Sequence, residues 1–487
     1  MSLAAVSTKS IPPNKGGVMA TLMILAPLVL LTICLLAKFD YIVVPSGGRG
    51  LIIAGLLLSL FATGMPISIA LGLSVLTFMF TMTDVPIVTV SLKLFTGIEK
   101  FEIMSIPFFI LAGTFLTHGG VAKRMIHFAR TMIGHWYGGL GLAGVVSCAL
   151  FAAISGSSVA TVVAIGSILL PAMVEQGYPK RFGAGVIATS GALGILFPPS
   201  INLVLYAVAT SGMRPIGPNG MPVNGASIGQ LFIAGIVPGL CLATVLGVVT
   251  FYQAYKNDYP RMPKSTWAER GRAFLDSFWG LFLIVIVIGG IYAGLFTPTE
   301  AAATAAVYAF VVAVFVYRDI GFKDVPGILL NAASMSAMIL YIVTNAVLFS
   351  FLMVSEQIPQ GMAAWMTAQG LGVVGFMVLC NLILLAAGNV MDPSSMVLIF
   401  APILFPVAVR LGVDPVHFGV MMAVNMESGL CHPPVGLNLY VASGIAKMGI
   451  SELTVAVLPW LLAMIGFLLV ITFYPPLTLF LPHYLGM

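Results

Sequence analysis

Four short segments of this sequence carry groups that could bind ions. They are 155–158 (SGSS), 194–202, 388–395 and 429–438, each rich in Gly, Pro, Ser and Asn and each set within a long apolar stretch. Hydroxyl, amide and bare peptide oxygens suit a hard monovalent cation, and the N-termini of interrupted helices attract anions. The segments therefore predict sodium sites beside an anion site. The alternative is that Pro and Gly only kink buried helices.

Three acidic residues stand out within the apolar stretches: Glu300, Asp392 and Glu427. A buried acid is costly in lipid, so each is a functional candidate. Asp392 precedes Pro393 and Glu300 follows Thr-Pro-Thr, and both are typical helix-capping positions. Glu427 has no such explanation, and either biases the site toward cations, pairs with a donor in the other half, or carries a proton. His432 either donates to an anion or satisfies a carbonyl.

The motifs do not favour an enzyme. The sequence has no P-loop of the form GxxxxGK[ST] and no HExxH. The segment AISG at 153–156 resembles the GxSG serine motif of intramembrane rhomboid proteases, but Ala153 replaces its first Gly and a serine nucleophile needs a paired base. A protease is therefore a remote alternative. The five cysteines show no ligand spacing, so we expect sodium as the one metal, no transition metal and no organic cofactor.

Composition places the chain in a lipid bilayer. It is 60% hydrophobic and 8% charged, whereas soluble domains are about 25% charged. Apolar stretches long enough to span recur along the whole length, which predicts an all-α polytopic membrane protein. The net charge of +5 therefore does not indicate nucleic-acid binding; its Lys and Arg residues instead indicate which loops face the cytoplasm.

Most apolar stretches predict single crossings. They lie at 17–37, 51–63 (short and uncertain), 66–83, 103–117, 230–256, 276–296, 298–317, 327–355 and 453–480. Residues 137–176 and 372–410 each have two apolar arms around a polar tip, which predicts two re-entrant hairpins. Residues 182–212 and 416–446 each carry Pro-Pro near the middle, which predicts two broken helices. The stretches 121–135 and 356–370 are expected to be interfacial helices, either surface connectors or rigid arms that brace a moving unit.

Two copies of one pattern recur along the chain. Equivalent positions lie 232 or 235 residues apart, in the pairs Pro66 and Pro298, Gly156 and Gly388, Pro171 and Pro406, and Pro198-Pro199 and Pro433-Pro434. Related halves can build one site and expose it alternately to either side of a membrane. We therefore expect an extension with one extra helix at 1–50, a first repeat at 51–297 and a second at 298–487.

Charge bias predicts that the two copies are inverted. Loop 256–272 holds five Lys or Arg and is expected to be cytoplasmic. Counting crossings from that loop makes the first hairpin open from the cytoplasm and the second from the outside. The segment before the first hairpin, 121–135, has three Lys or Arg, and the segment before the second, 356–370, has none. This difference is the one that opposite orientation requires.

A known family is recognisable in five motifs: AAISGSSVATVVAIGSILLPAMVEQGYPKRFGAGV, SGALGILFPPSI, AGLFTPTEAAA, GNVMDPSSMVLIFAPILFPVA and ESGLCHPPVGLNLYVASGIA. They closely resemble the large membrane subunit of tripartite ATP-independent periplasmic (TRAP) transporters over about residues 50–482. The resemblance implies a sodium-driven importer of small organic anions, of carboxylate or sialic-acid type, in the bacterial inner membrane. It implies an elevator motion, a separate small membrane subunit and a periplasmic binding protein. A stand-alone ion-coupled anion transporter or channel is the alternative.

The resemblance also implies site residues. One sodium site would use the first hairpin tip and the first break, at Ser155, Gly156, Ser157, Ser158, Gly194, Phe197 and Pro199. The other would use the second tip and break, at Gly388, Asp392, Gly429, His432, Pro433 and Gly436. Substrate would lie between the tips, near Ser200, Asn202, Ser394 and Asn438. The family usually has Thr where this chain has His432, which removes a hydroxyl ligand from the second site.

Overall fold

The structure is a computed structural model that describes residues 17–433 and 436–487, and the elements named in that part of the chain are all helices. Eight of the described helices are long and apolar enough to cross a membrane. The all-α multi-pass architecture predicted from composition is therefore confirmed. Residues 1–16 of the expected extension, together with Pro434 of the second Pro-Pro pair, lie outside the described residues.

The N-terminal helices follow the predicted crossings with one addition. They are α1 (Gly17–Lys38), α2 (Ser46–Ala62), α3 (Ile67–Met82), α4 (Ile87–Thr96), the 3₁₀ turn η1 (Phe101–Met104) and α5 (Ser105–His118). The sequence analysis did not predict α4. This helix begins after Pro86 and buries only Val90 of its ten residues, and so short an exposed helix gives no spanning signal.

The first hairpin forms as predicted. After α6 (Val121–Ile133), α7 (Gly139–Ser155) and α8 (Ser158–Glu175) are the two arms of the hairpin and pack on each other. Gly156 ends α7 with a φ of +60°, a left-handed conformation that glycine adopts without steric cost. Ser157 caps α8 by accepting a hydrogen bond from the Ala160 N–H at 3.4 Å. The four-residue tip therefore reverses the chain by local rules.

The first broken helix also forms as predicted. Its parts are α9 (Lys180–Ser190), the 3₁₀ turn η2 (Gly191–Ile195) and α10 (Ile201–Thr210), which are separated by an unwound segment with a cis Pro198–Pro199 bond. Proline has no N–H to continue the helix. The side chain of Ser200 restarts it by accepting from the Leu203 N–H at 3.4 Å.

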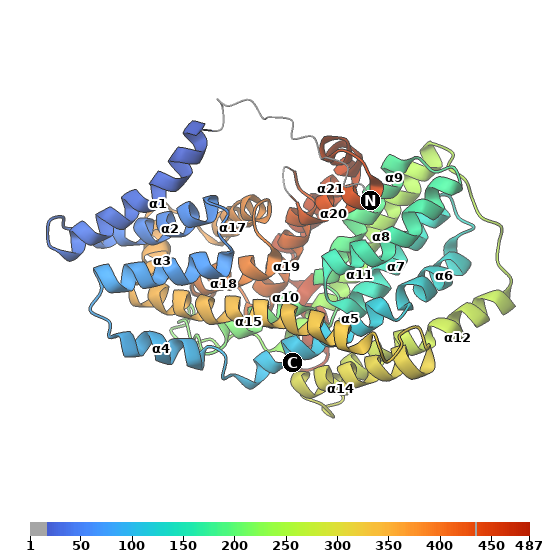
Figure 1. Cartoon of the computed structure of the whole chain (residues 1–487), viewed down its shortest axis with the longest axis horizontal. Coiled ribbons are helices and arrows are strands. Elements are labelled where there is room, and N and C mark those ends of the chain that lie inside the picture. Colours follow the sequence, from blue (N-terminus) through green and yellow to red (C-terminus); the bar gives the residue numbers. More distant parts are fainter. Residues whose placement is uncertain (1–16, 434–435) are drawn as a thin grey trace, which may run out of the picture.

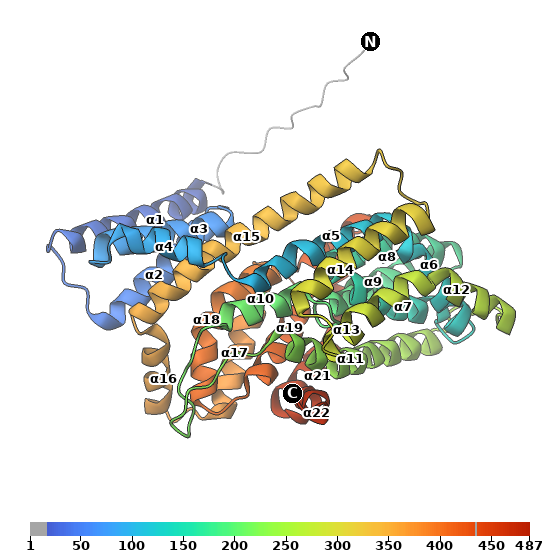
Figure 2. The same ribbon diagram turned by 90° about the horizontal axis from the view of Figure 1, so that it is seen from below.

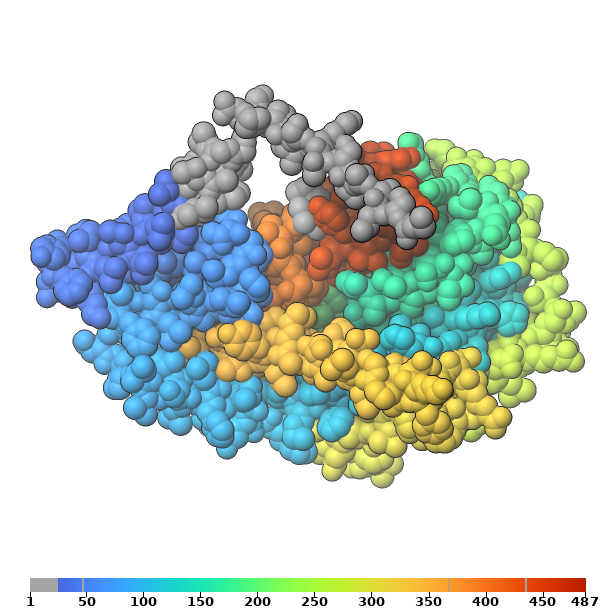
Figure 3. Space-filling model, in the orientation of Figure 1, coloured from blue at the N-terminus to red at the C-terminus, as the bar shows by residue number. Residues whose placement is uncertain are grey.

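The middle of the chain supplies long straight helices. They are α11 (Ile228–Lys256), α12 (Trp267–Ile284) with a π-helical turn η3 (Val285–Gly289) and α13 (Gly290–Tyr292), α14 (Pro298–Val311) with a second π-helical turn η4 (Val312–Val316), and α15 (Val325–Ser355). Helix α15 runs nearly along the long axis in Figure 1 and crosses the molecule obliquely in Figure 2, from beside α14 to beside α2, α3 and α4. It forms a continuous surface band on the face seen in Figure 3.

The C-terminal part repeats the order of the first half. It contains α16 (Ile358–Ala368), the hairpin arms α17 (Val373–Gly388) and α18 (Pro393–Arg410), the broken helix α19 (Pro415–Leu430) and α20 (Leu437–Ala446), and then α21 (Ile450–Phe473) and α22 (Pro476–Tyr484). The crossing predicted at 453–480 is found as α21, but it ends earlier than predicted, at Phe473, and a separate short helix, α22, starts at Pro476. The Pro475-Pro476 pair interrupts the helix there.

Helices of the two copies pack on each other reciprocally. The element α10 packs on the hairpin arm α18, and its counterpart α20 packs on the hairpin arm α8. Likewise α9 packs on α21 while α19 packs on α11, and α5 packs on α14 while α15 packs on α3. A two-fold relation between the copies requires such pairs; the inverted repeat itself, with its bounds, stays a prediction. We call α7–α10 and α17–α20 the hairpin core, and α3, α5, α14 and α15 the frame.

Candidate functional site

The first hairpin tip lies directly against the first break. A methyl group placed on Gly194 would stand 2.6 Å from the backbone of Ser157 and Ser158, and one on Gly156 would collide with the Pro199 carbonyl oxygen. Peptide groups from two separate segments therefore meet without an intervening side chain, which only glycine permits. Ser155, Gly156 and Ser158 are buried, and Ser157 is half-buried.

Hydroxyl groups surround the first tip. The Ser158 hydroxyl donates to the Ala192 carbonyl at 3.2 Å, and the Thr161 hydroxyl donates to the Ser157 carbonyl at 2.8 Å. The oxygens of Ser155 and Thr161 lie 3.1 Å apart. The sequence analysis missed Thr161, although it stands one turn after Ser157 on the same face of α8 and could have been found from that spacing. The tip thus concentrates neutral oxygens at one buried point.

The residues predicted at the first break contribute mainly backbone. Residues 191–200 are all buried. The Phe197 ring packs against Gly239 of α11, which leaves Phe197 only its carbonyl for an ion. Pro199 likewise offers a carbonyl beside Gly156. The unwound peptide oxygens, rather than these side chains, are what the break supplies.

The second tip and break meet in the same way. A methyl group on Gly388 would stand 3.0 Å from the Gly429 Cα, and one on Gly429 would stand 3.1 Å from the Gly388 Cα. The N–H of Gly436 donates to the His432 carbonyl at 3.1 Å, which curls the break back on itself. Pro433 is half-buried beside it. Gly388 and Gly429 are the counterparts of Gly156 and Gly194, so the same glycine positions make the tip-to-break contacts in both copies, although Gly156 meets Pro199 and Gly194 meets Ser157 and Ser158.

Two side-chain contacts at the second tip were only partly predicted. Asp392 caps α18, with its carboxylate accepting from the N–H of Ser395 at 3.0 Å and from the Ser395 hydroxyl. The capping interpretation of Asp392 is therefore confirmed. The Nδ1 atom of His432 lies 3.0 Å from the Asn389 side-chain oxygen, which links the break to the tip. Ser395 could have been found from its spacing to the cap, whereas no local signal identifies Asn389.

The four predicted substrate residues do not form one cluster. The Ser394 hydroxyl donates to the Asn202 side-chain oxygen at 3.2 Å, so these two meet where α18 and α10 begin. Ser200 is fully buried and caps α10. Asn438 is also fully buried, but its amide donates to the Ala188 carbonyl of α9 at 3.3 Å. The structure therefore places Asn438 against α9, whereas Ser394 lies against α10.

The two remaining acids have different surroundings. Glu300 forms a capping box with Thr297, whose N–H and hydroxyl both donate to the Glu300 carboxylate, at 2.8 and 2.9 Å. Its predicted capping position is confirmed. Glu427 is fully buried in α19, and neither of its carboxylate oxygens has a hydrogen-bond partner among the described residues. No capping role applies to Glu427.

Comparison with known proteins identifies the family. The family model "Tripartite ATP-independent periplasmic transporter, DctM component" matches residues 54–477. The C4-dicarboxylate TRAP transporter large permease protein DctM of Rhodobacter capsulatus is 69% identical over 90% of this chain and 99% of its own length. The protein of the same name from Pseudomonas aeruginosa is 48% identical over 82% of this chain and 90% of its own.

Solved structures show the same fold at low identity. The YdaH transporter of Alcanivorax borkumensis has a TM-score of 0.58 and 16% identity, and the match covers 94% of this chain and 98% of that one. At that identity the likeness shows the fold alone. The match to the family model, together with the close relatives, shows the subunit: this chain belongs to the family of TRAP transporter large permease subunits.

Proposed function

We propose that this permease subunit imports C4-dicarboxylates across the bacterial inner membrane by sodium symport. The substrate class follows from the name of the relative that is 69% identical over nearly its whole length. Sodium coupling is supported by one structural observation above all. In both copies, a glycine-bearing hairpin tip meets the backbone of a broken helix at a buried point. Peptide carbonyls freed from helical bonding are good sodium ligands there.

The anion would bind between the two tips. Helices α10 and α18 begin at Ser200 and Asp392, and Asn202 and Ser394 touch at these beginnings. Helix N-termini carry partial positive charge and free N–H groups, which stabilise a carboxylate. Sodium ions at both tips would add positive charge on either side of it. Binding of the ions and of the dianion would then be mutually favourable.

A basic cavity supports an anionic cargo. A cavity of about 450 Å³ lies between the frame and the hairpin core, where Lys93, Lys100 and Arg214 line it and none of its described lining residues is acidic. The positive charge of this cavity would raise the local concentration of a dianion. By the crossing count, the loop that carries Arg214 faces the outside, from which a periplasmic binding protein would deliver substrate.

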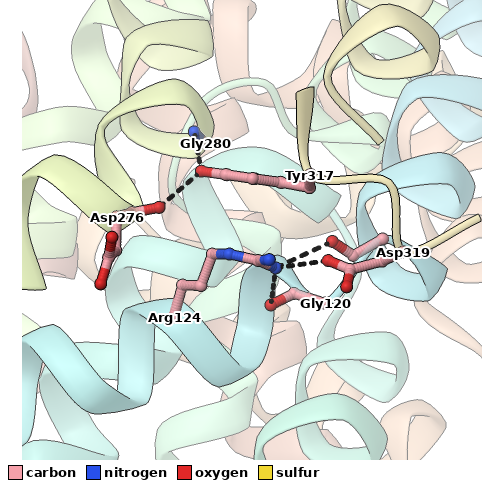
Figure 4. Close-up of polar contacts among 7 residues, drawn as sticks. Gly120, Arg124, Asp276, Gly280, Tyr317 and Asp319 are labelled. Atoms are coloured by element: carbon pink, nitrogen blue, oxygen red, sulfur yellow. Dashed lines mark hydrogen bonds and ion pairs between the residues drawn. The ribbon is translucent and has the colours of Figure 1, made fainter. Parts of the chain in front are cut away.

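We further propose that the hairpin core moves against the frame. The helix α6 precedes the first hairpin and is bonded to the segment after η4, outside the core: the Arg124 guanidinium pairs with Asp319 and lies 3.8 Å over the Tyr317 ring (Figure 4). The Tyr317 hydroxyl in turn donates to the Asp276 carbonyl of α12 at 2.9 Å. This fixed attachment favours α6 as a bracing arm over a passive connector.

Glycines mark the turn after the arm. Gly134 and Gly138 lie between α6 and α7, Gly139 begins α7, and Gly138 has a φ of +67°. In the proposed motion, this turn is the point at which the first hairpin would pivot while α6 stays in place. We propose that a small membrane subunit, encoded as a separate chain, supports the frame on its exposed side, as the resemblance implies.

The test is uptake by the reconstituted complex with its binding protein in proteoliposomes. Uptake of labelled succinate is expected to require sodium on the outside and to stop when the sodium gradient is dissipated by an ionophore. A proton ionophore alone should leave the uptake dependent on sodium. Undiminished uptake without a sodium gradient would refute the coupling, and conductance from the permease alone would favour a channel.

A further inference from the structure

A buried carboxylate in α19 has no counter-charge in the structure. Glu427 is 0% exposed, and both of its oxygens are without a hydrogen-bond partner among the described residues. A charge in that position is costly unless it is paired. The three ion pairs found in the described part of the chain involve other residues. Something that these residues do not provide must therefore neutralise Glu427.

The helices around α19 offer no cation. Those that pack on it are α10, α11, α17, α18, α20, α21, α22 and η2. Their described sequences contain only two Lys or Arg, Lys256 and Arg410, and each is the last residue of its helix. A protein ion pair with Glu427 is therefore not available from either half.

A second buried oxygen without a donor belongs to the same broken helix. Cys431 stands one turn after Glu427 and within electrostatic reach of it. The Cys431 thiol and the Asn438 amide both donate to the Ala188 carbonyl at 3.3 Å, and the Asn438 nitrogen lies 4.0 Å from the thiol sulfur. The Asn438 side-chain oxygen is buried and has no donor among the described residues. Two buried side chains of the second broken helix thus carry acceptors that have no donor among the described residues.

Glu427 lies on a different face of its helix from the residue that contacts the second hairpin tip. Gly429 faces the second tip at Gly388. Glu427 is two residues earlier, which rotates it by about 200° around the helix. Its carboxyl instead faces the backbone of Leu196, in the break of the first copy. The offset that matches Gly429 with Gly194 matches Glu427 with Ala192, so the first copy has no equivalent acid.

We infer that Glu427 and Asn438 bind a sodium ion at a third position, between the second broken helix and the first. A proton on Glu427 would remove the charge and turn one of the three oxygens into a donor, which would leave two acceptors, the other Glu427 oxygen and that of Asn438. A sodium ion contacts several oxygens at once and neutralises the carboxylate. Because the ion would join α19 and α20 to α9 and η2, it would tie the two halves of the hairpin core together. The inference rests on the proposed sodium coupling.

Equilibrium binding of labelled sodium to the purified complex tests this position without transport. We expect Glu427→Gln, which keeps the shape and removes the charge, to bind one sodium ion fewer per permease. We expect Asn438→Ala to weaken the affinity for that ion about tenfold, a loss of about 1.4 kcal/mol. The Hill coefficient of uptake for sodium should fall in parallel. Ser428→Ala is the matched control, because that hydroxyl bonds only within α19, to the Val424 carbonyl at 3.2 Å.

Each outcome decides one statement. If Glu427→Gln binds as many sodium ions as the unaltered permease, the third position is overturned. It is also overturned if uptake by Glu427→Gln keeps its normal sodium dependence but loses its pH dependence, because that result identifies Glu427 as a proton carrier. If the unaltered complex binds no sodium, the proposed sodium coupling fails instead. Should Glu427→Gln fail to fold, Glu427→Asp replaces it: it retains the charge, and we expect the same stoichiometry with weaker affinity. An affinity that Glu427→Asp and Asn438→Ala both leave unchanged would equally overturn the inference.

Discussion

Single glycines determine whether a hairpin tip can reach its break. A Cβ at Gly194 would stand 2.6 Å from the backbone of the first tip, a distance that requires the tip to move away. We expect Gly194→Ala to raise the half-saturating sodium concentration for uptake by about 10- to 100-fold, as other losses of support around metal ligands do. The measurement is uptake at increasing sodium concentration.

The matched control is Gly444→Ala in α20. No atom lies within 4 Å of the Cβ position of Gly444, so this alanine should leave uptake unchanged and slightly stabilise the helix. Equal sodium dependence in the two variants would show that the first tip does not bind the ion.

One side-chain contact at the second tip, between His432 and Asn389, can be tested by substitution. It links the second break to the second tip at 3.0 Å. We expect His432→Ala and Asn389→Ala each to raise the half-saturating sodium concentration, and the double variant to be no worse than either single one. A coupling of about 1 kcal/mol is typical for such a bond. Additive effects in the double-mutant cycle would show that the two side chains act separately.

Among the helices, α6 is the element whose attachment can be tested directly. Its Arg124 pairs with Asp319, donates to the Gly120 carbonyl at 3.1 Å and stacks on Tyr317. Loss of these half-exposed contacts by Arg124→Ala should cost about 1–2 kcal/mol. We expect a lower melting temperature and slower uptake with unchanged sodium affinity.

Lys123→Ala on the same helix is the control, because Lys123 is solvent-exposed. The charge-reversed pair Arg124→Asp with Asp319→Arg should recover part of the lost stability. Unaltered uptake in Arg124→Ala would argue that α6 is only a connector.

Elements marked by Pro and Gly could be predicted from the sequence, and others could not. The two hairpins and two breaks were located correctly because Gly156 and the Pro-Pro pairs interrupt apolar runs by local sterics. The helix α4 was missed because it is short and mostly exposed. The end of α21 before Pro475 was missed because residues 453–480 form one continuous apolar stretch, which predicts a single span. Contacts such as Ser394 with Asn202, 192 positions apart, arise only from the folded packing.

At the scale of the whole molecule, the proposed motion separates two groups of helices. Lys100, on the segment before η1 and α5, donates to the Ser211 hydroxyl after α10 at 2.7 Å. A cross-link between cysteines at these two positions, in a chain without its five native cysteines, would join the frame to the hairpin core. We expect it to stop uptake, and a reducing agent should restore it.

The control cross-link replaces Asn381 and Asn425, which bond at 2.8 Å between α17 and α19, two helices of the hairpin core. Since the proposed motion does not separate these helices, uptake should survive this link. Full uptake with the first link in place would rule out a sliding core.

The reciprocal packing of α8 with α20 also affects how the protein is made. The final surface of α8 is completed by a helix that begins 262 residues after α8 ends, at Leu437. At about 5–20 residues per second, the ribosome needs roughly 13–50 s to synthesise that interval. The nascent first hairpin must therefore wait in the insertion machinery without its native neighbour, and stalling or truncation before Leu437 should leave it open to membrane proteases.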